Sequence, residues 1–347
     1  MAKKKEKEDE GKLSIVDAVM KGIRKDYGEV FHSAKDIVEY DPVLVSVSPK
    51  IDHMLKGGVP EGVTATFSGK PGSGKTTTAL TLAANAQKLG KVVYFISVEG
   101  RITRKDLSGI EGLDLDPQKF VIVESAEEKI LTGNDFLDIT LRIINQHKGC
   151  VIIFDSLSSI SDSQEVANGV NHQARGSAAK VASTFSRQTS QTVKVNKIIL
   201  ILILHIQTVQ GAGMSYQDEK VADTVKYLRS LEMRIKKFEP WTMGSGENEQ
   251  QIGQKINWEV KKNPLGPPGR KTESFLRYGI GIDKVAEICG LAEEFGLIEK
   301  GGSWYTVDFV EDEKKPKVQG ENGLHDLFRN DKALFEQLEV KVKELLS

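Results

Sequence analysis

The chain has 347 residues, 39% of them hydrophobic and 28% charged, which is typical of a folded globular protein with one sizeable core and small appendages. Its 48 Lys and Arg residues nearly balance its 49 Asp and Glu residues, so net charge does not point to a nucleic acid or another polyanion as partner. No apolar run approaches the roughly 20 residues of a membrane span, and no hydrophobic signal segment opens the chain, which predicts a cytoplasmic protein without a membrane partner.

The N-terminal region is predicted to be a mobile, charged tail followed by a detachable arm. Apolar residues recur at intervals of three and four between Ser14 and Tyr27, the spacing of an amphipathic helix that Ser14 would cap. That helix either covers its own core or, with a short strand predicted at Val30–Phe31, docks on a neighbouring subunit. A hinge-like stretch, residues 33–42, follows the arm.

Residues 69–76, GKPGSGKT, fit the phosphate-binding spacing G-x-x-x-x-G-K-[ST] without a mismatch. An apolar strand is predicted before this phosphate loop at 63–67 and a helix after it at 77–89. In that context, backbone N–H groups at the start of a helix can surround an anion. A glycine-rich turn before an ordinary helix is the alternative, and the full match disfavours it. The residues predicted to hold a nucleotide are Gly69, Lys70, Pro71, Gly72, Ser73, Gly74, Lys75, Thr76 and Thr77.

Two side chains of the loop and two carboxylates beyond it have predicted roles. Lys75 would reach the β- and γ-phosphates, and the Thr76 hydroxyl would ligate Mg²⁺. Strands and helices then alternate, the pattern of a mostly parallel sheet with crossover helices. Asp155 follows a strand at 150–154 and is predicted to hold Mg²⁺ directly or through water. Glu99 follows a strand at 91–98, and position alone does not separate a catalytic carboxylate from a solvated loop residue.

The most apolar stretch, residues 197–204, is predicted to be a central strand covered on both faces, and His205 ends it. His205 is either a satisfied structural residue or a sensor of the nucleotide. Two polar, glycine-containing segments, 161–175 and 206–221, are predicted to be loops, and loops of this length are usually functional or disordered. Strands are predicted at 225–238 and 254–260, with a disordered connection between them.

Two groups of basic residues are candidates for anion contacts, although an ordinary solvated surface is the alternative. One group contains Lys261 and Lys262. The other contains Lys180 and Arg187, which lie on one face of a helix predicted at 176–192.

A boundary is predicted at 279–281, before a smaller α-rich part with helices at 284–294 and 330–346. The two cysteines, Cys150 and Cys289, lie in apolar segments and have no metal-binding spacing, so we expect buried, inert thiols.

The order of these parts resembles the RecA family of homologous-recombination ATPases, most closely the bacterial pattern, over about residues 13–346. One departure is His205, since bacterial members have glutamine there and some phage recombinases have histidine, which favours a phage or divergent source. The last motif of the series is specific, because P-loop proteins at large do not share it. The motifs are the V-S-x-x-x-x-I-D-x-x-L-x-G-G-x-P-x-G segment at 45–62, GKPGSGKTT, the strand ending at Glu99, VIIFDSLSSI at 151–160, GSAAK at 176–180, VKYLRSLEMRI at 225–235 and LIEKGGSWYTVD at 297–308.

The resemblance implies an α/β fold: a RecA-like P-loop ATPase core with a mostly parallel central sheet, an N-terminal helix and strand arm, and a small α+β C-terminal domain. The implied domains are 1–33 for the tail and polymerisation arm, 34–278 for the core with two DNA-binding loops, and 279–347 for a C-terminal domain that contacts duplex DNA.

The resemblance also implies ATP and Mg²⁺ as bound groups. Glu99 would orient the attacking water, and Lys75 and His205 would be the other catalytic residues. Lys261 and Lys262 would reach across to the ATP of a neighbouring subunit, with the spacing leaving open which one acts.

Tyr227 and Phe31 would lie at the interface between subunits. The DNA-binding loops would be 168–175 and 206–219. The DNA-contacting residues carried over are Asn168, Gly169, Val170, Arg175, Gly176, Lys180, Ser183, Arg187, Val209 and Met214.

The function implied is that of an ATP-dependent DNA recombinase. It would form a helical homo-oligomeric filament on single-stranded DNA, hydrolyse ATP, pair the strand with homologous duplex DNA and exchange strands, in the cytoplasm and at the nucleoid. Two alternatives are a ring-forming helicase with the same core and an ATPase-deficient DNA-binding mediator. Filament geometry, accessory proteins, co-protease activity and the adenine contacts stay open, and residues 101–105 are the region to inspect for the last.

Overall fold

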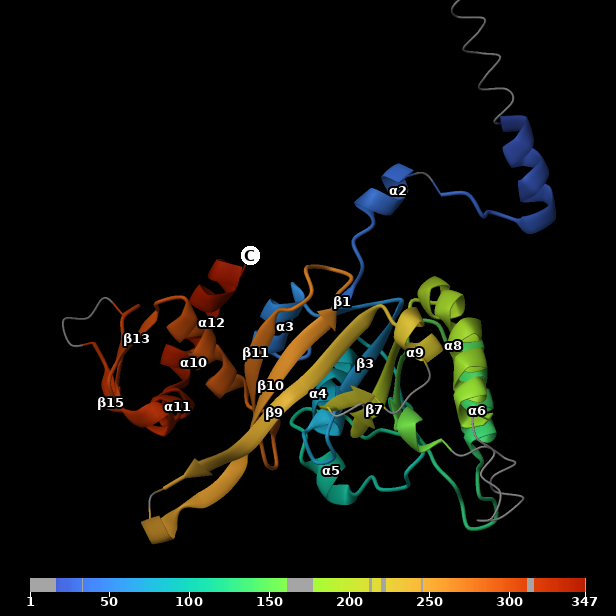
Figure 1. Ribbon diagram of the computed structural model, residues 1–347. Helices are drawn as coiled ribbons and strands as arrows, with labels where there is room; N and C mark the ends of the chain where they lie inside the picture. The colour runs from blue at the N-terminus through green and yellow to red at the C-terminus, as the bar shows by residue number, and fades with distance from the viewer. Residues whose placement is uncertain are drawn as a thin grey trace, which may run out of the picture. The chain divides into compact units, whose positions relative to one another are not determined.

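The computed structural model of the chain describes residues 17–32, 34–160, 177–211, 214–219, 223–244, 246–310 and 315–346 (Figure 1). The chain divides into two compact units, one up to Val43 and one from Leu44 onward. The first unit contains a helix over 17–27, as predicted, and helix α2 (Ala34–Glu39) within the predicted hinge. Val30 and Phe31 are not in a strand, since a strand needs a second backbone and none of the described segments pairs with them.

The second unit is built on one large sheet, which confirms the predicted fold class. The strands run in the order β12-β11-β10-β9-β3-β7-β6-β4-β5, and the six from β9 to β5 are parallel. The remaining pairs, from β9 to β12, are antiparallel. The strands are β3 (Val63–Gly69), β4 (Val93–Ser97), β5 (Phe120–Val123), β6 (Val151–Asp155), β7 (Ile199–Gly211), β9 (Leu231–Met243), β10 (Gln250–Lys262), β11 (Lys271–Arg277) and β12 (Gly281–Ile282).

Hydrophobic cores cover both faces of this sheet. In β7, Ile199, Ile201 and Ile203 pack in the cluster that includes helices α3 (Pro49–Leu55) and α4 (Lys75–Lys88). The alternate residues, Leu200 and Leu202 among them, pack in the cluster that includes α6 (Gly133–Gln146) and α8 (Ser177–Val195). Because side chains alternate along a strand, a continuous apolar run is explained only by burial on both sides, as predicted.

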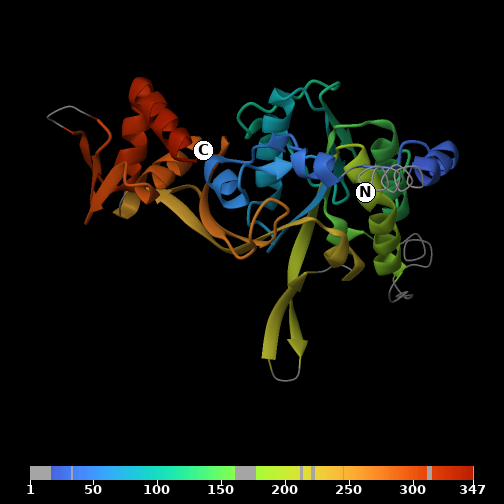
Figure 2. The ribbon, with the colours of Figure 1, turned by 90° about the horizontal axis from the view of Figure 1, so that it is seen from above.

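The segment after His205 differs from the loop that we expected. β7 continues to Gly211 and pairs with β8 (Met214–Glu219) in an antiparallel hairpin, which projects away from the sheet (Figure 2). Thr208, Val209 and Tyr216 are residues that favour strands, and the pairing satisfies backbone groups that a loop would leave to water. The prediction of a loop was based on the length and polarity of the segment and did not weigh these strand-favouring residues.

The base of this hairpin is fastened to the sheet by ion pairs. Lys226 Nζ lies 3.0 Å from Asp218 Oδ2, and Arg229, which is buried, pairs with Glu219 and with Glu232. Lys226 belongs to helix α9 (Asp223–Leu228), so the strand predicted over 225–238 begins only at Leu231, the first residue of β9. The side chain of Val225 is buried in the cluster that contains residues of α8 and of β7.

The connection between β9 and β10 is likewise structured where we expected disorder. The two strands pair almost to their tips, at Gln250 and Met243, and a 3-10 turn, η2 (Gly246–Asn248), lies between them. Among the smaller elements, β1 (Leu44–Val45) pairs with β2 (Val59–Pro60), α5 (Arg104–Ser108) follows β4, and the 3-10 turn η1 (Leu157–Ser159) follows β6.

A separate hydrophobic cluster forms beyond β12. It contains the predicted helices α10 (Lys284–Glu294) and α12 (Lys332–Leu346), the small sheet β13 (Ile298–Gly301), β14 (Trp304–Val307) and β15 (Lys317–Gln319), and one helix that was not predicted, α11 (Gly320–Asn330). The boundaries proposed between domains stay a prediction. Cys150 and Cys289 are both buried, and burial raises the pKa of each thiol, to about 12 for Cys150, which agrees with inert cysteines.

Candidate active site

The register of the parallel strands brings four strand ends together. Gly69 of β3 lies opposite His205 of β7, and Ser97 of β4 lies opposite Asp155 of β6. The carboxyl ends of parallel strands share one edge of a sheet, which is where ligands bind in open α/β folds. The phosphate loop, Glu99, Asp155 and His205 therefore meet although up to 136 positions separate them in the chain (205 − 69).

The phosphate loop joins β3 directly to α4. Gly72 and Gly74 have φ angles of +70° and +93°, the left-handed conformation that glycine adopts without strain. A Cβ atom at Gly74 would also lie 2.5 Å from Ile256 Cδ1 and 2.8 Å from Leu276 Cδ1, so the ends of these two side chains would have to move to admit it. The backbone therefore favours glycine at both positions, which explains why the motif specifies glycine at 74; Gly72 occupies a position that the motif leaves open.

Lys75 is the first residue of α4 and is 4% exposed. Its ammonium group donates to the carbonyl oxygens of Lys70 at 2.8 Å and Gly69 at 3.1 Å. Burial lowers the pKa of Lys75 to about 8, an effect that the carboxylates of Asp155 and Glu99 partly offset. A buried lysine with neutral partners is well suited to an anionic ligand, since a phosphate would restore its preference for the charged form.

Thr76 and Asp155 form the second half of the site. The Thr76 hydroxyl donates to Asp155 Oδ2 at 2.7 Å, and burial raises the pKa of Asp155. A hydroxyl and a carboxylate at this separation supply the hard oxygen ligands that Mg²⁺ prefers. The residues present therefore fit the predicted metal.

Glu99 is held by several partners at once, and its side chain is 16% exposed. Its Oε1 accepts from the hydroxyls of Ser156, at 2.8 Å, and Ser159, and lies 2.8 Å from His205 Nε2. Burial alone would raise the pKa of Glu99, but the hydrogen bonds from Ser159, His205 and Ser156 outweigh it and lower the pKa to about 2. Glu99 is thus a fixed anion and not the solvated loop residue that was the alternative.

His205 links this carboxylate to β7. Its backbone N–H donates to Ser158 Oγ at 2.9 Å, so the turn after β6 also holds the end of the strand. Sequence reasoning singled out His205 but gave no role to Ser156, Ser158 or Ser159. The serine-rich run that follows Asp155 was the available signal. A turn that directly follows a strand ending at the site lies at the same edge of the sheet, so its serines can reach Glu99 and His205.

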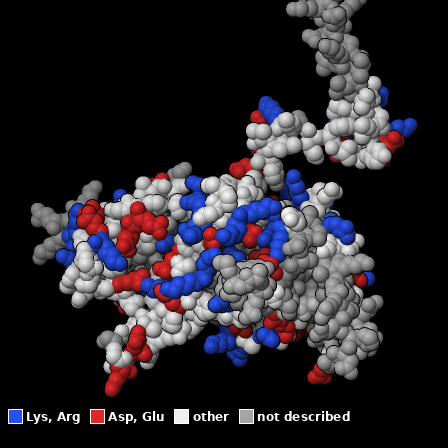
Figure 3. Space-filling model, viewed as in Figure 1, with Lys and Arg blue, Asp and Glu red and all other residues white. Residues whose placement is uncertain are grey.

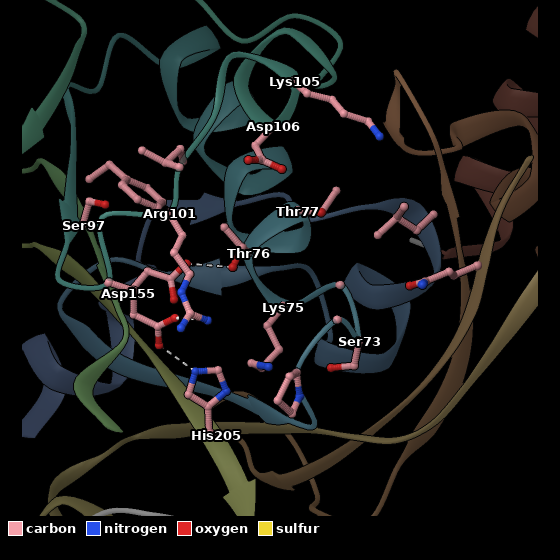
Figure 4. A pocket seen from close by; sticks show the side chains of 18 of the residues that line it. Ser73, Lys75, Thr76, Thr77, Ser97, Arg101, Lys105, Asp106, Asp155 and His205 are labelled. Atoms are coloured by element: carbon pink, nitrogen blue, oxygen red, sulfur yellow. Dashed lines mark hydrogen bonds and ion pairs between the residues drawn. The ribbon is translucent and has the colours of Figure 1, made fainter. Parts of the chain in front are cut away.

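A cavity of about 430 Å³ unites these groups (Figure 4). Pro71 to Thr77 line it, as do Glu99, Asp155 and His205, whereas Gly69 and Lys70 contribute the carbonyl oxygens that hold Lys75. Beyond the phosphate loop the lining continues with Arg101, Ile102, Lys105, Asp106, Gln254 and Tyr278. This part includes the region expected to contact a base.

Lys261 and Lys262 do not line the cavity of their own chain. Lys261 pairs with Glu259 at 3.0 Å and is 38% exposed, while Lys262 Nζ donates to the carbonyl oxygen of Arg229 at 2.6 Å. The two lysines therefore differ in how firmly their own chain holds them.

The residues predicted to contact DNA are only partly described. Asn168, Gly169, Val170, Arg175 and Gly176 lie outside the described residues. For Lys180, Val209 and Met214 the structure gives only the backbone: Lys180 is in α8, and Val209 and Met214 lie on the two arms of the β7–β8 hairpin.

Ser183 is partly exposed and Arg187 is exposed, both on α8. On the face drawn in Figure 3, lysine and arginine side chains form a band interrupted by acidic ones, in keeping with the near-neutral net charge. Any contact with a polyanion must therefore be local.

The predicted interface residues lie in different units. Tyr227, on α9, is 79% exposed. Phe31 is half-buried, with the Arg24 guanidinium 5.9 Å from the centre of its ring. No helix among the described residues is both long and apolar enough to cross a membrane.

Comparison with known proteins agrees with this arrangement. The sequence model of the RecA N-terminal domain matches residues 14–283. "Protein RecA" of Chloroherpeton thalassium is 25% identical to this chain over 339 residues, covering 96% of this chain and 90% of the relative. "Protein RecA" of Bacteroides thetaiotaomicron is 27% identical and covers 97% and 98%, and that of Mesoplasma florum is 25% identical and covers 95% of each. The resemblance stated from the motifs is therefore confirmed: the chain belongs to the RecA family.

Proposed function

We propose that this protein is an ATP-dependent DNA recombinase that forms a helical filament on single-stranded DNA and exchanges strands with homologous duplex DNA. The observation that carries the proposal is the continuity of β7. His205, which contacts Glu99 in the cavity, and Val209, in the hairpin assigned to DNA, belong to one strand, Ile199–Gly211. A change of ligand at either end has a direct mechanical route to the other.

Hydrolysis would use the side chains that line the cavity. Glu99, whose pKa is about 2, accepts a hydrogen bond from water and orients it without retaining the proton. The water oxygen bonds to the γ-phosphorus as the bond to the bridging oxygen breaks, the electron pair leaves with ADP, and the proton leaves with inorganic phosphate. Lys75 stabilises the developing charge. Mg²⁺ held near Thr76 and Asp155 would neutralise phosphate oxygens.

ATP would also join subunits. In this proposal a lysine from one subunit reaches the nucleotide held by the next, so nucleotide binding favours assembly. Lys261 is the better candidate, because its side chain is 38% exposed and is held by one partner, Glu259, whereas Lys262 is engaged by two backbone carbonyls. Loss of ATP-dependent assembly in Lys261→Ala, but not in Lys262→Ala, is the expected result in a light-scattering assay.

DNA binding would then be the sum of weak contacts from many subunits. Each subunit offers Arg187 and the hairpin, and multivalency explains how a chain of net charge −1 can bind a polyanion. Sequence would be read by base pairing, in keeping with the lack of a base-reading motif in the sequence.

A strand-exchange assay tests the proposal. Purified protein, ATP, Mg²⁺ and a single-stranded circle should convert a homologous linear duplex into joint molecules, and a heterologous duplex should give none. Absence of joint molecules with the homologous duplex under conditions of full ATP turnover would exclude recombinase activity.

Electron microscopy separates the remaining alternatives. Open helices in the presence of ATP and single strands are expected, whereas closed hexamers would indicate a ring helicase. Filaments without any ATP turnover would indicate a DNA-binding mediator.

A further inference from the structure

Arg101 is a charged residue in the cavity that the proposed mechanism has not used. Its guanidinium NH1 lies 3.2 Å from Glu99 Oε2, the carboxylate oxygen that the serines and His205 leave unoccupied. The Arg101 side chain is 83% exposed, yet it lines the same cavity as Lys75 and extends into it (Figure 4). A long, exposed cation at the mouth of an anion site can exchange partners.

The backbone that carries Arg101 is anchored on both sides. Before it, the Val98 N–H donates to the carbonyl oxygen of Asp155 at 2.9 Å. After it, a capping box begins α5, in which the Thr103 N–H donates to Asp106 Oδ2 at 2.9 Å and Thr103 Oγ1 accepts from the Asp106 N–H. Between these anchors Gly100 has a φ of +60°. The fold thus sets the backbone position of Arg101 at the cavity, while its exposed side chain can change rotamer.

The charges of the cavity also favour a cationic side chain in addition to Lys75. Glu99 and Asp155 are two carboxylates near the phosphate loop, and Lys75 is the buried cation among them. A triphosphate brings further negative charge to this edge of the sheet. Lys105 lines the cavity too, but it lies on α5 at the opposite end from Lys75 and His205 (Figure 4).

We propose that Arg101 acts as an arginine finger in cis, moving its guanidinium from Glu99 to the γ-phosphate when ATP binds. An exposed ion pair with a single hydrogen-bonded carboxylate is weak, and a guanidinium matches phosphate oxygens in a bidentate geometry. The exchange has two consequences. It frees Glu99 Oε2 for the attacking water, and it adds a further positive charge where charge develops on the transferred group. This inference rests on the proposed ATPase function of the same site.

The first experiment measures steady-state ATP turnover of the full chain with Mg²⁺ and single-stranded DNA. Arg101→Ala should lower kcat by about 100-fold, the size typical for removal of one charge-stabilising donor, with KM changed only a few-fold. Arg101→Lys should recover part of the loss, since it restores the charge but not the bidentate geometry. Arg142→Ala is the matched control: Arg142 is an exposed arginine on α6 that does not line the cavity, and its loss should leave turnover unchanged.

The second experiment separates contact with phosphate from an effect through Glu99. Affinity is measured for ADP and for ADP with aluminium fluoride, which mimics the transferring phosphoryl group. Arg101→Ala should weaken binding of the fluoride complex at least tenfold and leave ADP affinity within twofold. The same loss of affinity for the fluoride complex should occur when Arg101→Ala is made in a Glu99→Gln background. If Arg101 acted only by positioning Glu99, Arg101→Ala would cause no further loss of affinity in that background.

Two outcomes overturn the inference. A kcat of Arg101→Ala within twofold of the parent, or above it, would mean that Arg101 is merely a partner of Glu99. A parent protein that does not hydrolyse ATP, or one whose turnover survives Lys75→Ala, would overturn the proposed function itself and the inference with it. If turnover is lost in Lys75→Ala but kept in Arg101→Ala, the role proposed for Arg101 is rejected and the proposed ATPase function stands.

Discussion

The two halves of β7 have the same backbone conformation and opposite surroundings. From Ile199 to Leu204 the strand is buried on both faces, between β3 and β6. From Ile206 onward β8 is its only partner among the described strands, and it projects from the sheet (Figure 2). The buried half keeps the cavity rigid, whereas the projecting half is held by one neighbouring strand and by ion pairs at its base. In the proposed function, this one strand would join the cavity to the surface that binds DNA, with His205 at the junction.

The largest effect is expected at the buried end of this comparison. Glu99→Gln keeps the shape of the side chain but removes the charge that orients water, so ATP turnover should fall by about 1,000-fold, to background. DNA binding in the presence of ATP, measured by fluorescence anisotropy, should be kept. Unchanged turnover would remove Glu99 from the mechanism.

A substitution in the buried half of β7 should lower the free energy of unfolding much more than one in the projecting half. Leu200→Ala leaves a cavity in a fully buried position and should cost about 2–5 kcal/mol in the free energy of unfolding, measured by urea denaturation. Gln207→Ala, at an exposed position on the hairpin half, should cost less than about 0.5 kcal/mol. Equal costs would contradict the assignment of the hairpin to the periphery.

The affinity for ATP should depend on pH through Lys75. Burial holds its pKa at about 8 in the free protein, and an anionic phosphate would raise it again, so binding takes up a proton above pH 8. Affinity should therefore be constant below pH 7.5 and fall by up to about tenfold per pH unit above 8. Isothermal titration calorimetry in buffers of different ionisation enthalpy measures both quantities.

Lys75→Arg is the control for this dependence, because arginine stays charged throughout the range. A slope that persists in that variant would assign the titration to another group.

The smallest effect is expected at the hairpin. Met214→Ala should weaken binding of single-stranded DNA by about three- to tenfold, since one base contact is typically worth about 1 kcal/mol or more. ATP turnover without DNA should stay the same, because Met214 lies on β8, away from the cavity lining. A fall in DNA-free turnover of the same size would show that Met214 is needed for the structure of the cavity and does not act through DNA binding alone.

The cavity was largely predictable from the sequence, and the hairpin was not. The phosphate loop has a recognisable motif in part because the backbone favours glycine at 74, and the position of Asp155 follows from the strand before it. The hairpin has no such constraint. Its sequence is rich in polar residues and contains glycine, so the same letters are compatible with a loop, and antiparallel pairing with β8 became visible only in three dimensions.

By itself, the amino-acid order determined the strands that must be buried on both faces, the loop that surrounds a phosphate and the family to which the chain belongs. The first two properties depend on neighbours within a few residues, through the backbone freedom of glycine and the alternation of side chains along a strand. The family was indicated by the order of short motifs along the chain. Tertiary structure alone decided that Glu99 is held by Ser156, Ser159, His205 and Arg101. Those contacts join segments as far as 106 positions apart, and the register that aligns parallel strands is set by the packing of the whole sheet.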